Sequence, residues 1–311
     1  MPLDLRVRRF LDLLAATGPR SARDLTVLQR RRSLVDLTKF SGPPQSVAAV
    51  EESTVPGPEG PITVRVYTPN DAGDSPLPAL VYFHGGGLVA GSLETHDGVS
   101  RALANATGCR TFSVDYRLAP EHRFPAAIAD AYAATLHVSR RARDLGVDPG
   151  RIVVCGDSAG ATLAAVVCQM AAARGDVRVA LQLLICPIMD YAGRTESRRV
   201  LAEGYLVDED TLGHDLLHYL PPGTDPADPR VSPLRAGDLS GLPRTLVHTA
   251  EFDPLRDEGR AYADLLTEAG VETGYTCHPG MIHLFYALGA VIPYARTAYD
   301  LIGAEVRAAL V

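Results

Sequence analysis

Short apolar runs alternate along most of the chain with longer stretches in which apolar residues recur at helical spacing. The short runs predict buried strands and the longer stretches predict helices. The predicted strands cover residues 79–83, 109–114, 151–155, 181–186, 244–250 and 272–277. The predicted helices cover residues 95–106, 125–144, 159–173, 256–269 and 289–309. This alternation predicts an α/β fold in which helices cover both faces of a mostly parallel sheet.

Three segments depart from this alternation. Residues 62–67 alternate between apolar and polar positions, which predicts an edge strand. Residues 1–45 show helical spacing before the first core strand, and residues 190–230 interrupt the pattern with glycine and proline clusters. We therefore expect a cap segment at 1–45, a main domain at 46–311, and a cap insertion at 190–230 within that domain.

A serine lies between two glycines directly after a predicted strand. The segment Gly156–Gly160 has the sequence GDSAG and joins strand 151–155 to helix 159–173. Glycines on either side permit the sharp, strained turn that exposes a serine hydroxyl at a strand end. The segment predicts Ser158 as the nucleophile of a serine hydrolase.

A glycine-rich loop follows the predicted strand 79–83. Its sequence is His84-Gly85-Gly86-Gly87, so few side chains obstruct its backbone N–H groups. Such groups can stabilise the oxyanion that forms when a serine attacks a carbonyl. Together with the serine turn, the loop indicates an oxyanion hole rather than an ordinary turn.

A serine hydroxyl also needs a general base, which is oriented by an acid. Enzymes with this strand-to-helix serine place nucleophile, acid and histidine in that order along the chain. Of the nine histidines, only His278 and His283 follow a suitable acid. We predict His283 as the base because it lies in a loop segment before the last helix, and His278 is the alternative.

The acid is predicted at the end of strand 244–250, where active sites of α/β sheets gather. Asp253 follows this strand and precedes Pro254. An aspartate before proline is also typical of a helix N-cap. The chain order favours Asp253 as the acid, with Asp257 and Asp190 as alternatives.

Several further motifs accompany these residues over positions 60–290, and together they resemble the hormone-sensitive-lipase-like esterases. This family, also called bacterial family IV, has the α/β-hydrolase fold, and Asp157 places the chain in its GDSAG branch. The segments that carry the resemblance are His84–Gly87, Gly91–Leu93, Thr95–Asp97, Asp115–Glu121, Phe124–Pro125, Gly156–Gly160, Ser232–Leu234 and Asp253–Gly259.

The resemblance implies a serine carboxylesterase that hydrolyses short- to medium-chain esters through an acyl-enzyme, without cofactor or metal. It assigns Ser158, Asp253 and His283 as the triad. It also assigns the oxyanion hole to the N–H groups of three residues, Gly86, Gly87 and Ala159. The resemblance also implies that His84 shapes its loop rather than carrying a proton. Arg117 and Glu121 are expected to hold neighbouring loops by charge-assisted hydrogen bonds rather than to touch the substrate.

The chain departs from the family pattern at three positions. Ala161 replaces a second glycine after the serine motif, Leu88 replaces an aromatic after the oxyanion glycines, and Leu284 replaces a glycine after the histidine. Leu88 and Leu284 would alter substrate preference rather than the triad. The residues predicted to form the substrate pocket are Leu88, Tyr205, Leu206, Ile282 and Leu284.

Charge is distributed unevenly along the chain. The net charge is −7, yet residues 1–40 carry nine basic and four acidic side chains. Residues 3–14 form an amphipathic helix pattern, which fits a membrane-surface helix or a cap helix over the active site. We favour the cap, because acidic residues interrupt the basic face and the resembling family builds caps from its N-terminus. Arg30–Arg32 is expected to be a solvated turn.

The composition limits where the protein can reside in the cell and which partners it can bind. No run reaches the roughly 18 apolar residues of a membrane span, and charge interrupts any signal-peptide core at the start, so we expect a cytoplasmic protein. Five scattered cysteines suggest small buried side chains, not a disulfide framework or zinc site. The acidic body carries no nucleic-acid-reading motif.

Three hypotheses remain beside the general esterase, which acts on a small-molecule ester. A dedicated deacetylase or an acyltransferase for a specialised metabolite would use the same residues. A non-catalytic receptor on this fold is disfavoured because all three triad residues are present. Relatives in the resembling family often form dimers through the last strand and helix, so residues 272–309 could hold a homodimer.

Overall fold

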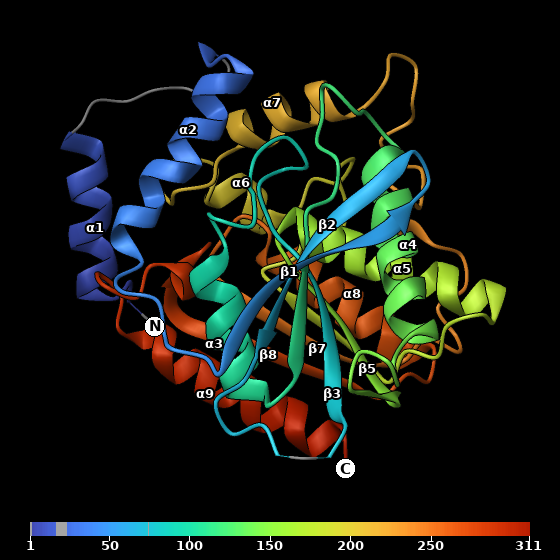
Figure 1. The fold of residues 1–311 in the computed structure, drawn as a ribbon. Helices are drawn as coiled ribbons and strands as arrows, with labels where there is room; N and C mark the ends of the chain where they lie inside the picture. The colour runs from blue at the N-terminus through green and yellow to red at the C-terminus, as the bar shows by residue number, and fades with distance from the viewer. Residues whose placement is uncertain (1, 17–23, 74) are drawn as a thin grey trace.

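The computed structural model describes residues 2–16, 24–73 and 75–311. Within these ranges eight strands form one sheet in the order β1-β2-β4-β3-β5-β6-β7-β8 (Figure 1). Pairing is antiparallel between β1 and β2 and between β2 and β4. All other neighbours are parallel. The strands are β1 (Ala49–Gly57), β2 (Gly60–Thr68), β3 (Leu77–Phe83), β4 (Arg110–Val114), β5 (Val147–Asp157), β6 (Leu181–Ile185), β7 (Arg244–Phe252) and β8 (Thr273–Ile282).

Helices cover both faces of the sheet. Alternate residues of β3 point to opposite faces, so Leu80 and Tyr82 join one apolar cluster while Val81 and Phe83 join the other. The first cluster includes α3 and α9, and the second includes α4, α5 and α8. The helices of the body are α3 (Asp97–Thr107), α4 (Ala126–Arg140), α5 (Ala159–Arg174), α8 (Arg256–Glu268) and α9 (Tyr294–Ala309). The predicted α/β fold with a mostly parallel sheet is confirmed.

The first strand of the sheet differs from the prediction. Residues 62–67 do form a strand, but β2 lies between β1 and β4 and is not an edge. The edge is β1, which the sequence pattern missed. Of its residues only Val55 is buried, so it lacks the apolar alternation that marks a strand with one covered face.

The N-terminal helices pack against the body. They are α1 (Leu5–Ala16) and α2 (Val27–Leu37), drawn in blue in Figure 1. Val7 and Phe10 of α1 are buried with Leu34 of α2 in the cluster that contains α3 and α9. Both helices are therefore docked on the body of the protein.

The prediction of a solvated turn at Arg30–Arg32 is wrong, because α2 runs through these residues. Arg30 forms a two-bond ion pair with Asp215, and Arg31 forms one with Glu121. Both carboxylate partners lie far from α2 in the sequence, so they could not be predicted from the basic run alone.

The insertion at 190–230 contains α6 (Glu196–Val200) and α7 (Glu209–Tyr219). A buried ion pair holds α6 against α8: Arg198 Nε donates to Glu258 Oε2 at 3.0 Å. Burial raises the pKa of Glu258 to about 7, although the Arg198 charge and the Met189 N–H oppose this rise. The positive charge of Arg198 therefore compensates the negative charge of the buried Glu258 carboxylate.

Replacing Arg198 should destabilise the fold. Arg198→Met leaves Glu258 buried without its cation, which typically costs about 3–5 kcal/mol. We expect this loss in the free energy of unfolding, measured with urea at a pH above the pKa of Glu258. The matched control is Arg199→Met, since Arg199 pairs with Glu196 on the exposed side of the same helix and should change stability by less than about 1 kcal/mol. Equal effects of the two changes would contradict the role given to the buried pair.

Candidate active site

Ser158 lies on a sharp turn between β5 and α5. Its backbone has φ 54° and ψ −122°, a strained conformation for a residue with a side chain. The flanking glycines are required by close backbone contact: a Cβ on Gly156 would lie 2.1 Å from the Gly160 oxygen, and one on Gly160 would lie 2.0 Å from the Phe83 oxygen. The predicted strand-to-helix turn is thus present, with the serine at its apex.

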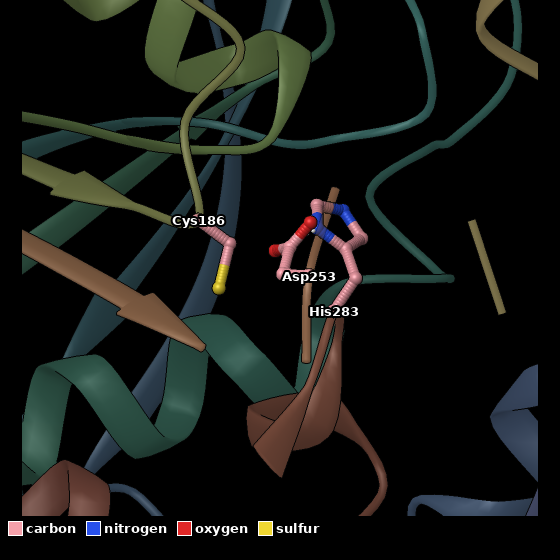
Figure 2. Close-up of side chains that lie close together, drawn as sticks. All are labelled: Cys186, Asp253 and His283. Carbon is pink, nitrogen blue, oxygen red and sulfur yellow. Dashed lines mark hydrogen bonds and ion pairs between the residues drawn. The ribbon is translucent and has the colours of Figure 1, made fainter. Parts of the chain in front are cut away.

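Ser158, His283 and Asp253 form a continuous chain of hydrogen bonds. His283 Nε2 lies 3.1 Å from Ser158 Oγ, and His283 Nδ1 lies 2.8 Å from Asp253 Oδ2. An ionised carboxylate only accepts hydrogen bonds, so this contact places a proton on Nδ1 and leaves Nε2 free to accept one. Asp253 Oδ1 accepts the Leu255 N–H at 2.9 Å, which fixes the carboxylate. Figure 2 shows Asp253 and His283 facing each other.

The environment of His283 favours its charged form. Burial acts to lower the pKa of this imidazole, but the charge of Asp253 and its hydrogen bond outweigh burial and leave the pKa raised. The imidazolium that forms on proton transfer is therefore stabilised where it lies.

The glycine loop lies against the serine turn. Gly86 and Gly87 have φ values of 119° and 66°, which favour glycine. In the described part of the chain, the N–H groups of Gly86, Gly87 and Ala159 donate to no protein acceptor. These three N–H groups are the ones that the resemblance assigns to an oxyanion hole.

Asp157 ties the loop to the serine turn. Its Oδ1 accepts the Gly85 N–H at 3.0 Å and the Tyr82 hydroxyl at 2.5 Å, while its Oδ2 accepts the Tyr286 hydroxyl at 2.7 Å. Neither tyrosine could be predicted from the sequence, because a tyrosine within an apolar run does not indicate which group its hydroxyl binds. These bonds fix the relative positions of nucleophile and loop.

The alternative triad residues lie elsewhere. His278 contacts His248, with Nε2 3.2 Å from that residue's Nδ1. Asp257 accepts the Ser197 N–H at 2.7 Å, and Asp190 pairs with an arginine. None of the three contacts Ser158.

One further side chain lies beside the acid and the histidine. The Cys186 sulfur, a carboxylate oxygen of Asp253 and a ring nitrogen of His283 lie within 4.8 Å of one another (Figure 2). Burial and the Asp253 charge hold the pKa of the thiol well above its ordinary value, so it stays protonated. A metal there would need the thiolate and would break the bond between Asp253 and His283. The group therefore fits a triad better than a metal centre.

A cavity of about 620 Å³ opens above Ser158 and His283. Its walls come from the glycine loop, from α2 and from the insertion around α7. The apolar part of the lining is Leu14, Leu25, Leu34, Leu37, Phe40, Ile188, Leu206, Val207, Leu212 and Leu284. This lining suits a small-molecule substrate that has an apolar chain attached to a polar reacting group.

Two of the five predicted pocket residues, Leu206 and Leu284, line this cavity. The other three do not. Leu88 and Ile282 are buried in the two apolar clusters, and Tyr205 stacks on Phe252 with ring centroids 5.7 Å apart. Proximity in sequence to a glycine loop or a histidine does not determine which way a side chain points.

Comparison with known proteins agrees with this geometry. Residues 80–287 match the family model described as the alpha/beta hydrolase fold. This chain belongs to that family. Carboxylesterase NlhH of Mycobacterium tuberculosis is 43% identical over 270 residues, which are 84% of each chain. Carboxylic ester hydrolase LipN of the same organism is 42% identical over 79% of this chain and 66% of LipN.

The solved structures include an ester hydrolase from the metagenome of Lake Arreo, complexed with a bipyridine phosphonate derivative. It superposes on this α/β hydrolase with a TM-score of 0.95 and 42% identity, and covers 98% of each chain. The predicted resemblance to hormone-sensitive-lipase-like esterases and the prediction of a carboxylic ester hydrolase are confirmed.

Other motif residues of this α/β hydrolase hold loops in place. His84 Nδ1 lies 2.8 Å from the Gly85 oxygen, and its ring stacks on Tyr116 with centroids 4.4 Å apart. Burial lowers the pKa of His84 to about 3, so it is neutral near pH 7. Arg117 pairs with Asp130. No helix in the described ranges combines the length and hydropathy that a membrane crossing requires.

The raised pKa of His283 predicts how activity depends on pH. The imidazole must be neutral to accept the serine proton, so kcat/KM should fall as the pH drops below the raised pKa. We expect an acid limb with an apparent pKa above the ordinary histidine value of about 6.5 in the pH–rate profile of a small ester. An acid limb centred below that value would contradict the described surroundings of His283.

Proposed function

We propose that this carboxylic ester hydrolase acts on short- to medium-chain esters through an acyl-enzyme on Ser158. The hydrogen-bond chain from Ser158 through His283 to Asp253 is the observation that carries the proposal. The apolar cavity above the serine supports a small-molecule substrate.

In the first step the Ser158 hydroxyl attacks the ester carbonyl while His283 Nε2 takes the hydroxyl proton. The carbonyl oxygen becomes an oxyanion that the N–H groups of Gly86, Gly87 and Ala159 stabilise. Such donors each contribute about 3 kcal/mol to lowering the barrier. His283 then gives its proton to the leaving alcohol, and the acyl group remains on the serine.

In the second step water releases the acyl group. His283 takes a proton from water as the water oxygen attacks the acyl carbonyl, and the same N–H groups receive the second oxyanion. The proton returns to the Ser158 oxygen as the carboxylic acid leaves. Asp253 stays ionised throughout and keeps the Nδ1 proton of His283 in place.

We also propose that residues 1–45 and 190–230 act as a cap, since α2 and the α7 region both contribute to the cavity lining. A cytoplasmic location remains a prediction. So does a homodimer, which β8 would permit as an edge strand of the sheet.

Initial rates on p-nitrophenyl esters from acetate to dodecanoate test the proposed reaction. We expect activity that falls beyond medium chains, and a loss of several orders of magnitude for Ser158→Ala. Turnover by Ser158→Ala close to that of the native protein would refute the assigned nucleophile. A folded native protein that hydrolyses no ester in the series would refute the proposed substrate range.

The acid is tested by two matched changes. Asp253→Asn should reduce kcat on the order of 10⁴-fold, because it favours the wrong His283 tautomer. Asp257→Asn is the control, since its carboxylate binds the Ser197 N–H away from the serine. If Asp257→Asn lowered kcat more than Asp253→Asn, the acid would be misassigned.

A further inference from the structure

An ion pair joins the two cap segments beside the glycine loop. Arg30 of α2 donates to both carboxylate oxygens of Asp215 in α7, from Nε at 3.0 Å and from Nη2 at 2.7 Å. The side chains are only 12% and 4% exposed. The chain places these residues 185 positions apart, and α2 and α7 lie close together in Figure 1.

The Asp215 carboxylate lies directly against the glycine loop. A Cβ on Gly87 would be 1.9 Å from Asp215 Oδ2, so only a glycine leaves room for this oxygen. Asp215, Arg30 and Gly87 all line the cavity together with Ser158 and His283. A carboxylate thus lies next to a residue whose N–H is free for the substrate oxygen.

A carboxylate at this place is unfavourable for the proposed reaction unless its charge is compensated. The oxyanion develops negative charge near Gly87, and two like charges a few ångströms apart at intermediate permittivity can slow a reaction on the order of 10²-fold. Arg30 supplies the opposite charge through a fork that matches the carboxylate. His214 also faces it, with Nδ1 3.1 Å from Asp215 Oδ1 and Nε2 3.0 Å from the Leu25 oxygen.

We propose that Arg30 is a positioning residue for ester hydrolysis, because it cancels the Asp215 charge beside the oxyanion hole and holds that carboxylate against Gly87. The inference rests on the function proposed above. It adds a requirement that the triad alone does not have. For the oxyanion to be stabilised, Arg30 of α2 must form its ion pair with Asp215 of α7.

A purely structural role for Arg30 is the competing explanation. In that case the ion pair would only fasten α2 to α7, and loss of either partner would be equally harmful. Arg31 offers a matched comparison, because it holds the same helix through Glu121 and the Val89 and Ala119 carbonyl oxygens. Its carboxylate partner is exposed, so its loss leaves no buried charge at Gly87.

The experiment is a double-mutant cycle on the full chain with p-nitrophenyl acetate. Arg30→Gln should lower kcat about 30-fold with little change in KM, because the carboxylate loses its two-bond cation, keeps only His214 beside it, and acts on the transition state. Asp215→Asn should cost less than about fivefold, and the double variant should recover at least about tenfold over Arg30→Gln. Arg30→Lys should retain more activity than Arg30→Gln, because the charge remains.

Arg31→Gln combined with Asp215→Asn is the control and should show no recovery over Arg31→Gln. Circular dichroism and thermal unfolding of each variant establish that it is folded. If Asp215→Asn fails to rescue folded Arg30→Gln, or if Arg30→Gln is as active as the native protein, the inference is wrong. The native protein distinguishes this result from a failure of the proposed function. If the proposed function is wrong, the native protein itself will not hydrolyse the ester; if only the role of Arg30 is wrong, the native protein will hydrolyse it and Ser158→Ala will not.

Discussion

The close backbone contact between the serine turn and the end of β3 determines where every other part of the site can lie. Gly160 approaches the Phe83 oxygen so closely that no side chain fits between them. This contact brings the serine turn beside the glycine loop that follows β3. Asp157 then fastens the two through the Gly85 N–H and two tyrosine hydroxyls. The proposed nucleophile and oxyanion donors are thereby held in one fixed arrangement, which is what transition-state stabilisation requires.

The sheet completes the site by bringing distant segments to one edge. Ser158, Asp253 and His283 follow the carboxyl ends of β5, β7 and β8, and these ends meet because the strands are parallel. Residues of α2 and of the insertion around α7 line the cavity at this edge. One ion pair between these two segments reaches the glycine loop, and the proposed role of Arg30 is based on this contact.

Much of this arrangement could be predicted from the sequence. The central strands β3, β5 and β6 were found because they are covered on both faces and are therefore mostly apolar. The turn at Ser158 was found because only glycine fits at Gly156 and Gly160, and the chain order of the triad led to His283. The exposed strand β1 gave no such pattern. Arg30 was missed because its partner lies on another cap segment, and Leu88 because side-chain direction depends on tertiary packing.

An acyl-enzyme on Ser158 is the intermediate on which the proposed reaction depends. It can be trapped by rapid mixing of the native protein with excess p-nitrophenyl acetate, followed by acid quenching and by intact-protein and peptide mass spectrometry. We expect an early burst of p-nitrophenol of up to one equivalent and an acetyl group on the peptide that contains Ser158, with neither in Ser158→Ala. An acetyl group on another residue, or release of p-nitrophenol by folded Ser158→Ala at the rate of the native protein, would contradict it.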